Sequence, residues 1–263
     1  MPRELPSLEE FINRQQNEEH EEFELDFKPD YLYQSNAELK NLITSGQKVF
    51  GVPAASLSWG IDGNRMKASL QPGMEGERMV ARILDEYAKT HKGVYVFHSL
   101  SWPESNGDTD HILVYKDLVV VIDAKRWKAQ RKYSVTDKGS IKRGTVAFQQ
   151  GRVKIRYALN AWRKKIPKDV RVTGIVCIAQ SKVFVMRDKN WFKAPFRLVE
   201  AEKLTDQLDY MLKNHKTEAV GTSGALLLYF GKLLVKPRDI LEELLNKEAL
   251  LPPEKNPPQQ SPN

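Results

Sequence analysis

The sequence predicts an α/β protein, because helical and strand patterns alternate along its central part. Apolar residues recur at helical spacing over two stretches, and strand-like apolar runs lie between and after them. The run from Val170 to Ala179 is rich in β-branched residues, which is typical of a strand buried on both faces. The expected central elements are a helix at about 75–90, strands near 93–98, 109–116 and 118–125, a helix at about 146–164 and the strand at 170–179.

Two capping boxes predict short helices before this central part. Ser7-x-x-Glu10 opens one helix, and Ser35-x-x-Glu38 opens a second helix that ends near Gly46. Residues 47–72 hold scattered Gly, Pro and Ser, so they are interpreted as a loop or linker.

Weaker patterns complete the chain. They predict a polar hairpin at 130–143, a short strand at 182–186, and helices at 201–214 and 237–249. The tail after Leu251 is rich in proline and cannot build a core, so we expect it to be disordered. The expected parts are an acidic helical extension with linker (1–72), a central domain (73–215), a helical C-terminal extension (216–251) and the tail (252–263).

The composition leads us to expect a soluble, cytoplasmic protein that does not enter a membrane. The chain has 263 residues, enough to bury a sizeable core. Its longest purely apolar run, Ala225 to Phe230, is far shorter than the roughly 20 residues of a membrane span. The N-terminus lacks the apolar region of a signal peptide. The single Cys177 excludes an internal disulfide framework and a cysteine-based zinc site.

Charge is distributed unevenly along the chain. Residues 1–30 carry ten acids and three bases, and residues 125–171 carry sixteen bases and two acids. The basic segment is either a solvated surface or the footprint of a polyanion such as nucleic acid, and we favour the second because a candidate acidic site directly precedes it. The acidic segment could be a solvated helix, a cover over the basic surface, or a binding site for a protein partner.

A predicted hairpin brings two aspartates together. If Lys116-Asp117 forms a two-residue turn, the numbers of paired residues sum to 233, and Asp110 lies opposite Asp123. Strand alternation then places Asp110, Asp123 and Lys125 on one face, with His111 on the other as a buried polar histidine. Both faces are mainly apolar, so we expect the hairpin to be central in its sheet.

Two opposed carboxylates at the end of a buried hairpin need a cation, or one of them must hold a proton. A hard divalent ion with oxygen ligands, such as Mg²⁺ or Mn²⁺, suits this pair. Lys125 lies within reach of whatever such an ion binds, and its ammonium could orient a water or stabilise a phosphoryl transition state. The alternative is a pair of solvated strand ends with Lys125 as an ordinary ion-pair partner.

The helix at 75–90 contributes a third acid. Glu77 precedes Val80 by one turn, so it points to the same side as the apolar stripe, whereas Asp85 and the other charged residues are interpreted as ordinary surface. Gly76 would let the start of the helix approach the sheet closely. Glu77 could help to hold the metal or could instead interact with its own helix N-terminus.

These segments together resemble the nuclease-related domain (NERD) family of the PD-(D/E)XK nuclease superfamily. The resemblance covers about residues 73–180 and is moderately specific. The matching pieces, in order, are Gly73-Met74-Glu75-Gly76-Glu77, Gly107-Asp108-Thr109-Asp110-His111-Ile112-Leu113-Val114, Val121-Ile122-Asp123-Ala124-Lys125, and a glutamine at 149 or 150.

The resemblance implies a restriction-endonuclease-like αβββαβ core around a mixed sheet, with metal-dependent nuclease activity. By position, Asp110 and Asp123 would be metal ligands, Glu77 the acid from the helix, and Lys125 the residue that positions the attacking water. The family's glutamine would correspond to Gln150 rather than Gln149, because Gln150 shares a helical side with Tyr157. The family often has Glu where this chain has Asp123, and the glycine that often follows the triplet is missing.

The basic segment also contains aromatic residues on which bases could stack, although Tyr157 and Trp162 have the spacing of core residues. The expected phosphate contacts are Lys128, Arg131, Lys132, Lys142 and Arg143.

The sequence therefore predicts a Mg²⁺- or Mn²⁺-dependent nuclease that hydrolyses phosphodiester bonds, with DNA as the first candidate substrate. One rival hypothesis is a nuclease-like module that binds nucleic acid without cutting it. Another is a scaffold whose N-terminal extension and tail bind a protein partner.

Overall fold

The computed structural model describes residues 31–33, 35–58, 70–102, 108–147, 155–180, 182–186 and 191–237. The α-helices are α2 (Asn36–Thr44), α3 (Ala55–Ser58), α4 (Gln71–Thr90), α5 (Ile155–Lys165), α6 (Leu204–Lys213) and α7 (Gly224–Gly231). Short 3₁₀ turns are η2 (Trp191–Lys193) and η3 (Ala201–Lys203). The strands are β1 (Val49–Phe50), β2 (Val94–Ser101), β3 (Asp108–Tyr115), β4 (Leu118–Lys125), β5 (Lys132–Val135), β6 (Ile141–Arg143), β7 (Val146–Ala147), β8 (Arg171–Ile178), β9 (Phe184–Met186) and β10 (Arg197–Glu200).

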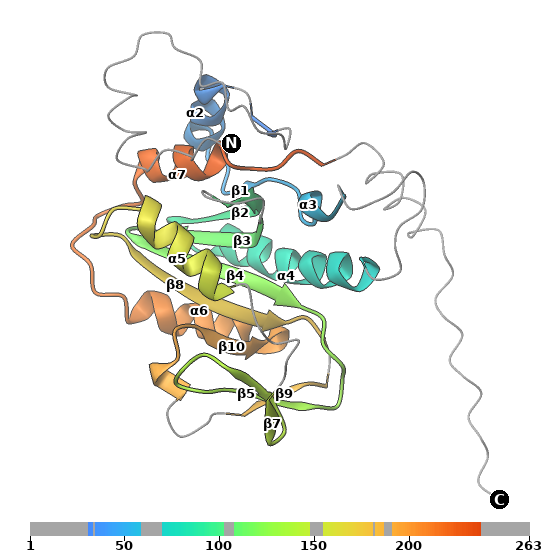
Figure 1. The fold of residues 1–263 in the computed structure, drawn as a ribbon. Coiled ribbons are helices and arrows are strands. Elements are labelled where there is room, and N and C mark those ends of the chain that lie inside the picture. The colour runs from blue at the N-terminus through green and yellow to red at the C-terminus, as the bar shows by residue number, and fades with distance from the viewer. Residues whose placement is uncertain are drawn as a thin grey trace, which may run out of the picture.

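A six-stranded mixed sheet in the order β1-β2-β3-β4-β8-β10 forms the centre of the molecule (Figure 1). Strands β2, β3 and β4 are antiparallel neighbours, whereas β8 runs parallel to β4 and β10 runs parallel to β8. The chain order α4-β2-β3-β4-α5-β8 gives the αβββαβ core, so the expected fold class is confirmed. A second sheet in the order β7-β6-β5-β9 lies beside β10 (Figure 1).

Helices cover both faces of the central sheet, which explains why its strands are apolar on both sides. Helices α4 and α6 cover one face, where Leu84 and Leu208 meet Val120 and Ile122 in one cluster. Helices α5, α7 and α2 cover the other face, where Trp162 is completely buried. No helix among the described residues is long and apolar enough to cross a membrane.

Helix α2 begins as the capping box predicts. The Ser35 side chain accepts a hydrogen bond from the Glu38 backbone N–H at 3.1 Å, which satisfies one of the free donors at the helix start. Gly46 follows the helix with a φ of +91°, a conformation that favours glycine. The two other predicted helices, from Ser7 and at 237–249, lie outside the described residues.

The predicted helix at 146–164 is wrong at its start. Val146 and Ala147 pair with β6 as strand β7, and the described part of α5 begins at Ile155. Tyr157 was expected in the core but is 72% exposed, because the buried side of α5 carries Ile155, Leu159 and Trp162. The interpretation of residues 47–72 as a loop or linker is wrong in part, because β1 pairs with β2 at the edge of the central sheet and α3 follows it. Helix α7 and strand β10 were not predicted either.

Candidate functional site

The β3–β4 hairpin has the predicted register. Tyr115 pairs with Leu118 and His111 with Ile122, so the numbers of paired residues sum to 233 in the structure as well. Lys116 adopts a φ of +55°, which a two-residue turn requires. Asp117, the second residue of the turn, binds the segment that follows α6. Its carboxylate accepts hydrogen bonds from His215 Nε2 at 2.6 Å and from Thr217 Oγ1 at 2.5 Å.

Asp110 lies where the β3–β4 ladder ends. His111 and Ile122 are the last backbone pair. Beyond them, the Ala124 N–H of β4 donates a hydrogen bond to Asp110 Oδ2 of β3 at 2.7 Å. The aspartate side chain therefore takes the place of a backbone acceptor and is buried in doing so. Next to it, the buried Thr109 Oγ1 accepts a hydrogen bond from Trp162 Nε1 of α5 at 3.1 Å.

Lys125 and Asp123 form a direct ion pair at the end of β4. The Lys125 ammonium donates to Asp123 Oδ1 at 2.7 Å and to the Ala124 carbonyl at 3.2 Å. The other carboxylate oxygen, Asp123 Oδ2, is buried and has no hydrogen-bond partner among the described residues. The pairing of β4 with β8 continues through Asp123 to Lys125, which keeps both side chains on an ordered strand.

Glu77 reaches the same region from α4. Its side chain is buried, and Glu77 Oε2 lacks a hydrogen-bond partner within the described part of the chain. The start of the helix lies close to the sheet: an added Cβ at Gly76 would be 3.4 Å from Arg126 Cβ and 3.5 Å from Ala179 Cβ. An ion pair between Arg126 and Glu75 joins the same two elements.

The charges of these side chains shift one another's pKa values. Burial raises the pKa of Glu77 well above its usual value, and the nearby carboxylates of Asp110, Asp108 and Asp123 raise it further while Lys125 opposes them. Burial also raises the pKa of Asp110 to about 7, although Lys125 and the Ala124 N–H favour its charged form. The same carboxylates raise the pKa of Lys125 despite its burial, so its ammonium stays charged.

The donor set fits a hard divalent cation. It consists of carboxylate oxygens, of which Glu77 Oε2 and Asp123 Oδ2 are buried without a hydrogen-bond partner among the described residues. Burial and the neighbouring carboxylates raise the pKa values of Glu77 and Asp110, and a cation would relieve this repulsion. Over the ranges that the structure describes, no three His, Cys, Asp or Glu side chains are already gathered into a metal cluster. Asp110, Asp123 and Glu77 are the residues that would hold such an ion.

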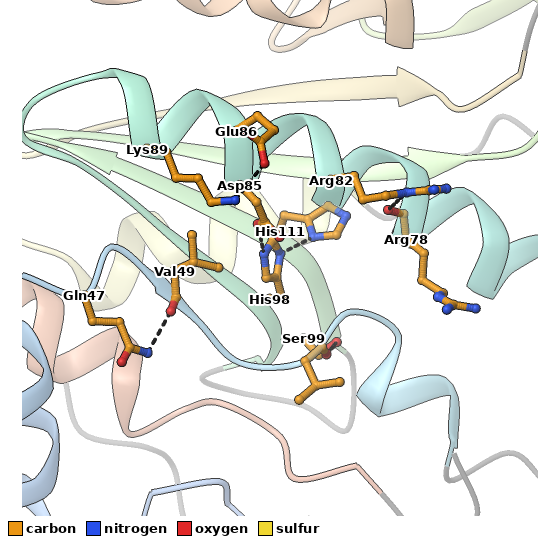
Figure 2. A network of polar contacts seen from close by, with 11 residues as sticks. Gln47, Val49, Arg78, Arg82, Asp85, Glu86, Lys89, His98, Ser99 and His111 are labelled. Atoms are coloured by element: carbon orange, nitrogen blue, oxygen red, sulfur yellow. Dashed lines mark hydrogen bonds and ion pairs between the residues drawn. The ribbon is translucent and has the colours of Figure 1, made fainter. Parts of the chain in front are cut away.

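A buried polar network joins Asp85 of α4, His98 of β2 and His111 of β3 (Figure 2). Strand alternation places His111 on the opposite side of β3 from Asp110. His98 Nε2 contacts Asp85 Oδ1 of α4 at 2.8 Å, and His98 Nδ1 contacts His111 Nδ1 at 2.8 Å. Because a carboxylate only accepts hydrogen bonds, His98 Nε2 is the donor to Asp85, and neutral His98 then accepts from His111. Burial, and then His98, lowers the pKa of His111 well below its usual value.

This network corrects the interpretation of Asp85 and identifies His98 as the partner of His111. Asp85 is not ordinary surface, because it is the partner of a completely buried histidine. His111 is a buried polar histidine, as predicted. Its pairing with His98 follows from the β2–β3 register, in which these two residues are direct partners, and that register is the signal that could have revealed it.

The predicted phosphate-binding residues lie beyond Lys125 along the chain. Lys128, Arg131, Lys132 and Arg143 are exposed and Lys142 is partly exposed. Lys132, Lys142 and Arg143 belong to the small sheet. Gln149 and Gln150 lie outside the described residues, as do the acidic residues 1–30, so their predicted roles stay predictions.

Residues 72–179 match the family model of the nuclease-related domain, NERD. The chain carries a nuclease-related domain. This region contains Glu77, Asp110, Asp123 and Lys125, and NERD is a branch of the PD-(D/E)XK nuclease superfamily, as the sequence motifs predict. Comparison with curated proteins and with solved structures gave no significant match.

Proposed function

We propose that the NERD region is a metal-dependent nuclease that hydrolyses phosphodiester bonds, with DNA as the first candidate substrate. The observation that carries the proposal is the convergence of Glu77, Asp110, Asp123 and Lys125 at one end of the β3–β4 hairpin. Carboxylate oxygens can hold a hard divalent ion, and an ammonium beside it can stabilise the charge of a phosphoryl transition state.

The reaction would add one water molecule across a P–O bond. The water oxygen forms a new bond to phosphorus while its proton is released, and the leaving oxygen departs and gains a proton. A bound Mg²⁺ would polarise the scissile phosphate and lower the pKa of a bound water.

The chain's own residues have separate tasks in this reaction. Because the pKa of Lys125 is raised, its ammonium is not a general base at neutral pH. It would donate hydrogen bonds that orient the water and would stabilise the negative charge of the transition state. The Ala124 N–H fixes the orientation of Asp110, and the ion pair with Lys125 fixes that of Asp123. The basic residues beyond Lys125 would hold the nucleic-acid backbone.

A nuclease assay with Mg²⁺ or Mn²⁺ tests the proposal. Asp123→Ala and Lys125→Ala should each lower the cleavage rate by about 100-fold or more, since each removes a group that acts on the transition state. Asp137→Ala and Lys213→Ala are matched controls, because both change an exposed residue of the same charge on another element, and they should cleave like the wild type. Cleavage that survives both site substitutions would refute the assignment.

A second candidate function is a module that binds nucleic acid without cutting it. The observation in its favour is that Lys125 already neutralises Asp123 directly. This candidate predicts salt-sensitive binding and no metal-dependent cleavage by the wild-type protein in the same assay.

A further inference from the structure

The small sheet β7-β6-β5-β9 has one covered face and one open face. Tyr133 and Val135 of β5 and Ile141 of β6 are buried on the covered face. Strand alternation turns the residues between them the other way. The pairings Lys132–Phe184, Ser134–Met186, Ser134–Lys142 and Lys142–Ala147 then define the open face, which consists of Lys132, Ser134, Lys142, Ala147, Phe184 and Met186.

The open face exposes large apolar side chains. Phe184 is 57% exposed and Met186 is 52% exposed, although both lie on a regular strand. They are next to each other on one side of β9, so they form a continuous apolar surface rather than scattered single residues. Such a surface on a soluble domain marks a binding site.

The charge around this apolar surface favours a polyanion as the ligand. Lys132 is the direct neighbour of Phe184 across the β5–β9 pairing, and Lys142 follows on β6. The six residues of the open face include no acid. Proteins that bind single-stranded nucleic acid combine these features, since cations hold the backbone and aromatic rings stack on unpaired bases.

Two short segments connect the small sheet to the strands that end at the candidate site. Strand β5 follows Lys125 of β4, and β9 follows Ile178 of β8, which is the residue that pairs with Lys125. The two connections are joined by backbone hydrogen bonds from Gln130 N–H to the Lys182 carbonyl at 2.8 Å and from Phe184 N–H to the Arg131 carbonyl at 3.1 Å. The small sheet is therefore tied directly to the strand ends that carry the candidate site.

We propose that the open face binds unpaired bases of single-stranded nucleic acid, with Phe184 stacking on a base and Lys132 contacting a phosphate. The proposal rests on the proposed function for the identity of the polymer, but binding at this face requires no cleavage. If the open face binds unpaired bases, the substrates of the candidate site are single strands or duplexes with unpaired regions.

Fluorescence anisotropy of the full chain tests the proposal. The probes are a labelled oligothymidylate of about 20 nucleotides and a blunt duplex of the same length, in a chelating buffer that prevents cleavage. Phe184→Ala should weaken binding of the single strand by about tenfold and leave duplex binding almost unchanged, whereas Phe184→Trp should retain the affinity. Lys132→Gln should lower the salt slope of single-strand binding by about 0.7.

Phe192→Ala is the matched control, because Phe192 is 55% exposed but lies on η2 outside the open face. Equal single-strand affinity of Phe184→Ala and wild type would overturn the proposal. So would an equal loss for single strand and duplex, or a change in oligomeric state on sedimentation that identifies a second copy of the chain as the occupant. The nuclease assay is independent of these results, so the proposed function and this inference can fail separately.

Discussion

At the scale of single residues, Asp110 is a buried acid among other carboxylates. The carboxylate is buried, accepts a hydrogen bond from the Ala124 N–H, and lies near other acids. Its pKa of about 7 exceeds the usual value of 3.8, so the unfolded chain releases this proton at lower pH than the folded chain. The stability of the metal-free protein should therefore fall as pH rises from about 4 to about 7.

Asp110→Asn tests this prediction, because the amide keeps an acceptor for the Ala124 N–H but does not titrate. Above pH 7 the variant should be more stable than the wild type, and the difference should vanish near pH 4. Urea denaturation at several pH values in a chelating buffer measures it. Added Mg²⁺ should stabilise the wild type more than the variant. A difference that does not depend on pH would contradict the raised pKa.

The pairing of residues within the β3–β4 hairpin could be predicted from the sequence, but the residues that pack around the hairpin could be predicted only in part. A two-residue turn at Lys116-Asp117 is enough to fix the β3–β4 register, although the observed backbone pairing ends at His111 and Ile122, one pair short of Asp110 and Asp123. The partner of His111 could not be found in the same way, because β2 and β3 are six residues apart in the sequence, and a connection of that length does not fix a register as a two-residue turn does. Tyr157 was misplaced because the buried side of α5 runs through Ile155, Leu159 and Trp162, and Tyr157 lies on the other side of the helix.

At the scale of elements, helix α4 is joined to the sheet by polar contacts along its length. Glu75 forms an ion pair with Arg126 near its start, Glu77 lies buried in the candidate site, and Asp85 binds His98 of β2 two turns later. The orientation that brings Glu77 to the sheet therefore depends on contacts on both sides of it.

Asp85→Ala should lower the free energy of unfolding by about 1–3 kcal/mol, because it leaves the buried His98 without its carboxylate partner. Asp85→Asn should recover part of this loss, since its carbonyl oxygen can accept the same hydrogen bond. Glu86→Ala, which removes only an exposed ion pair with Lys89 on the same helix, should have a much smaller effect. Chemical denaturation measures all three, and equal losses for Asp85→Ala and Glu86→Ala would contradict the assigned role.

Elements that lack an amphipathic pattern were the ones that sequence patterns missed. Helix α7 is apolar on every side, with Leu226 to Phe230 all buried, so helical periodicity gives no signal for it. Its N-cap, Ser223, accepts a hydrogen bond from the Leu226 N–H and was a usable cue. Strand β10 is only four residues long and becomes a strand by pairing with β8.

At the scale of the whole molecule, segments on both sides of the NERD match complete one core. Phe230 of α7 lies 5.7 Å from Phe97 of β2 and 5.3 Å from Trp162 of α5, measured between ring centroids. Leu39 of α2 lies against Gly231. The chain after α7 also continues the sheet contacts, because Val235 N–H donates to the Ser99 carbonyl and Leu32 N–H to the Leu234 carbonyl.

Phe230→Ala should therefore destabilise the protein by about 3–5 kcal/mol, because it opens a cavity between two aromatic residues of the NERD region. Phe230→Leu should cost less, since it fills most of the space. Val220→Ala, at a position that is 98% exposed, should be close to neutral. Thermal and urea unfolding measure these differences, and a small loss for Phe230→Ala would show that α7 is not part of the core.

The bridging of Leu234 to both Leu100 and Leu32 has a practical consequence for anyone who wishes to engineer this protein. Residues 72–179 alone, moved into another protein, would lack the side chains of α7 that cover Phe97 and Trp162. A fusion would have to carry residues 31–33 and helix α7 along with this region, or supply other apolar side chains that pack on Phe97 and Trp162.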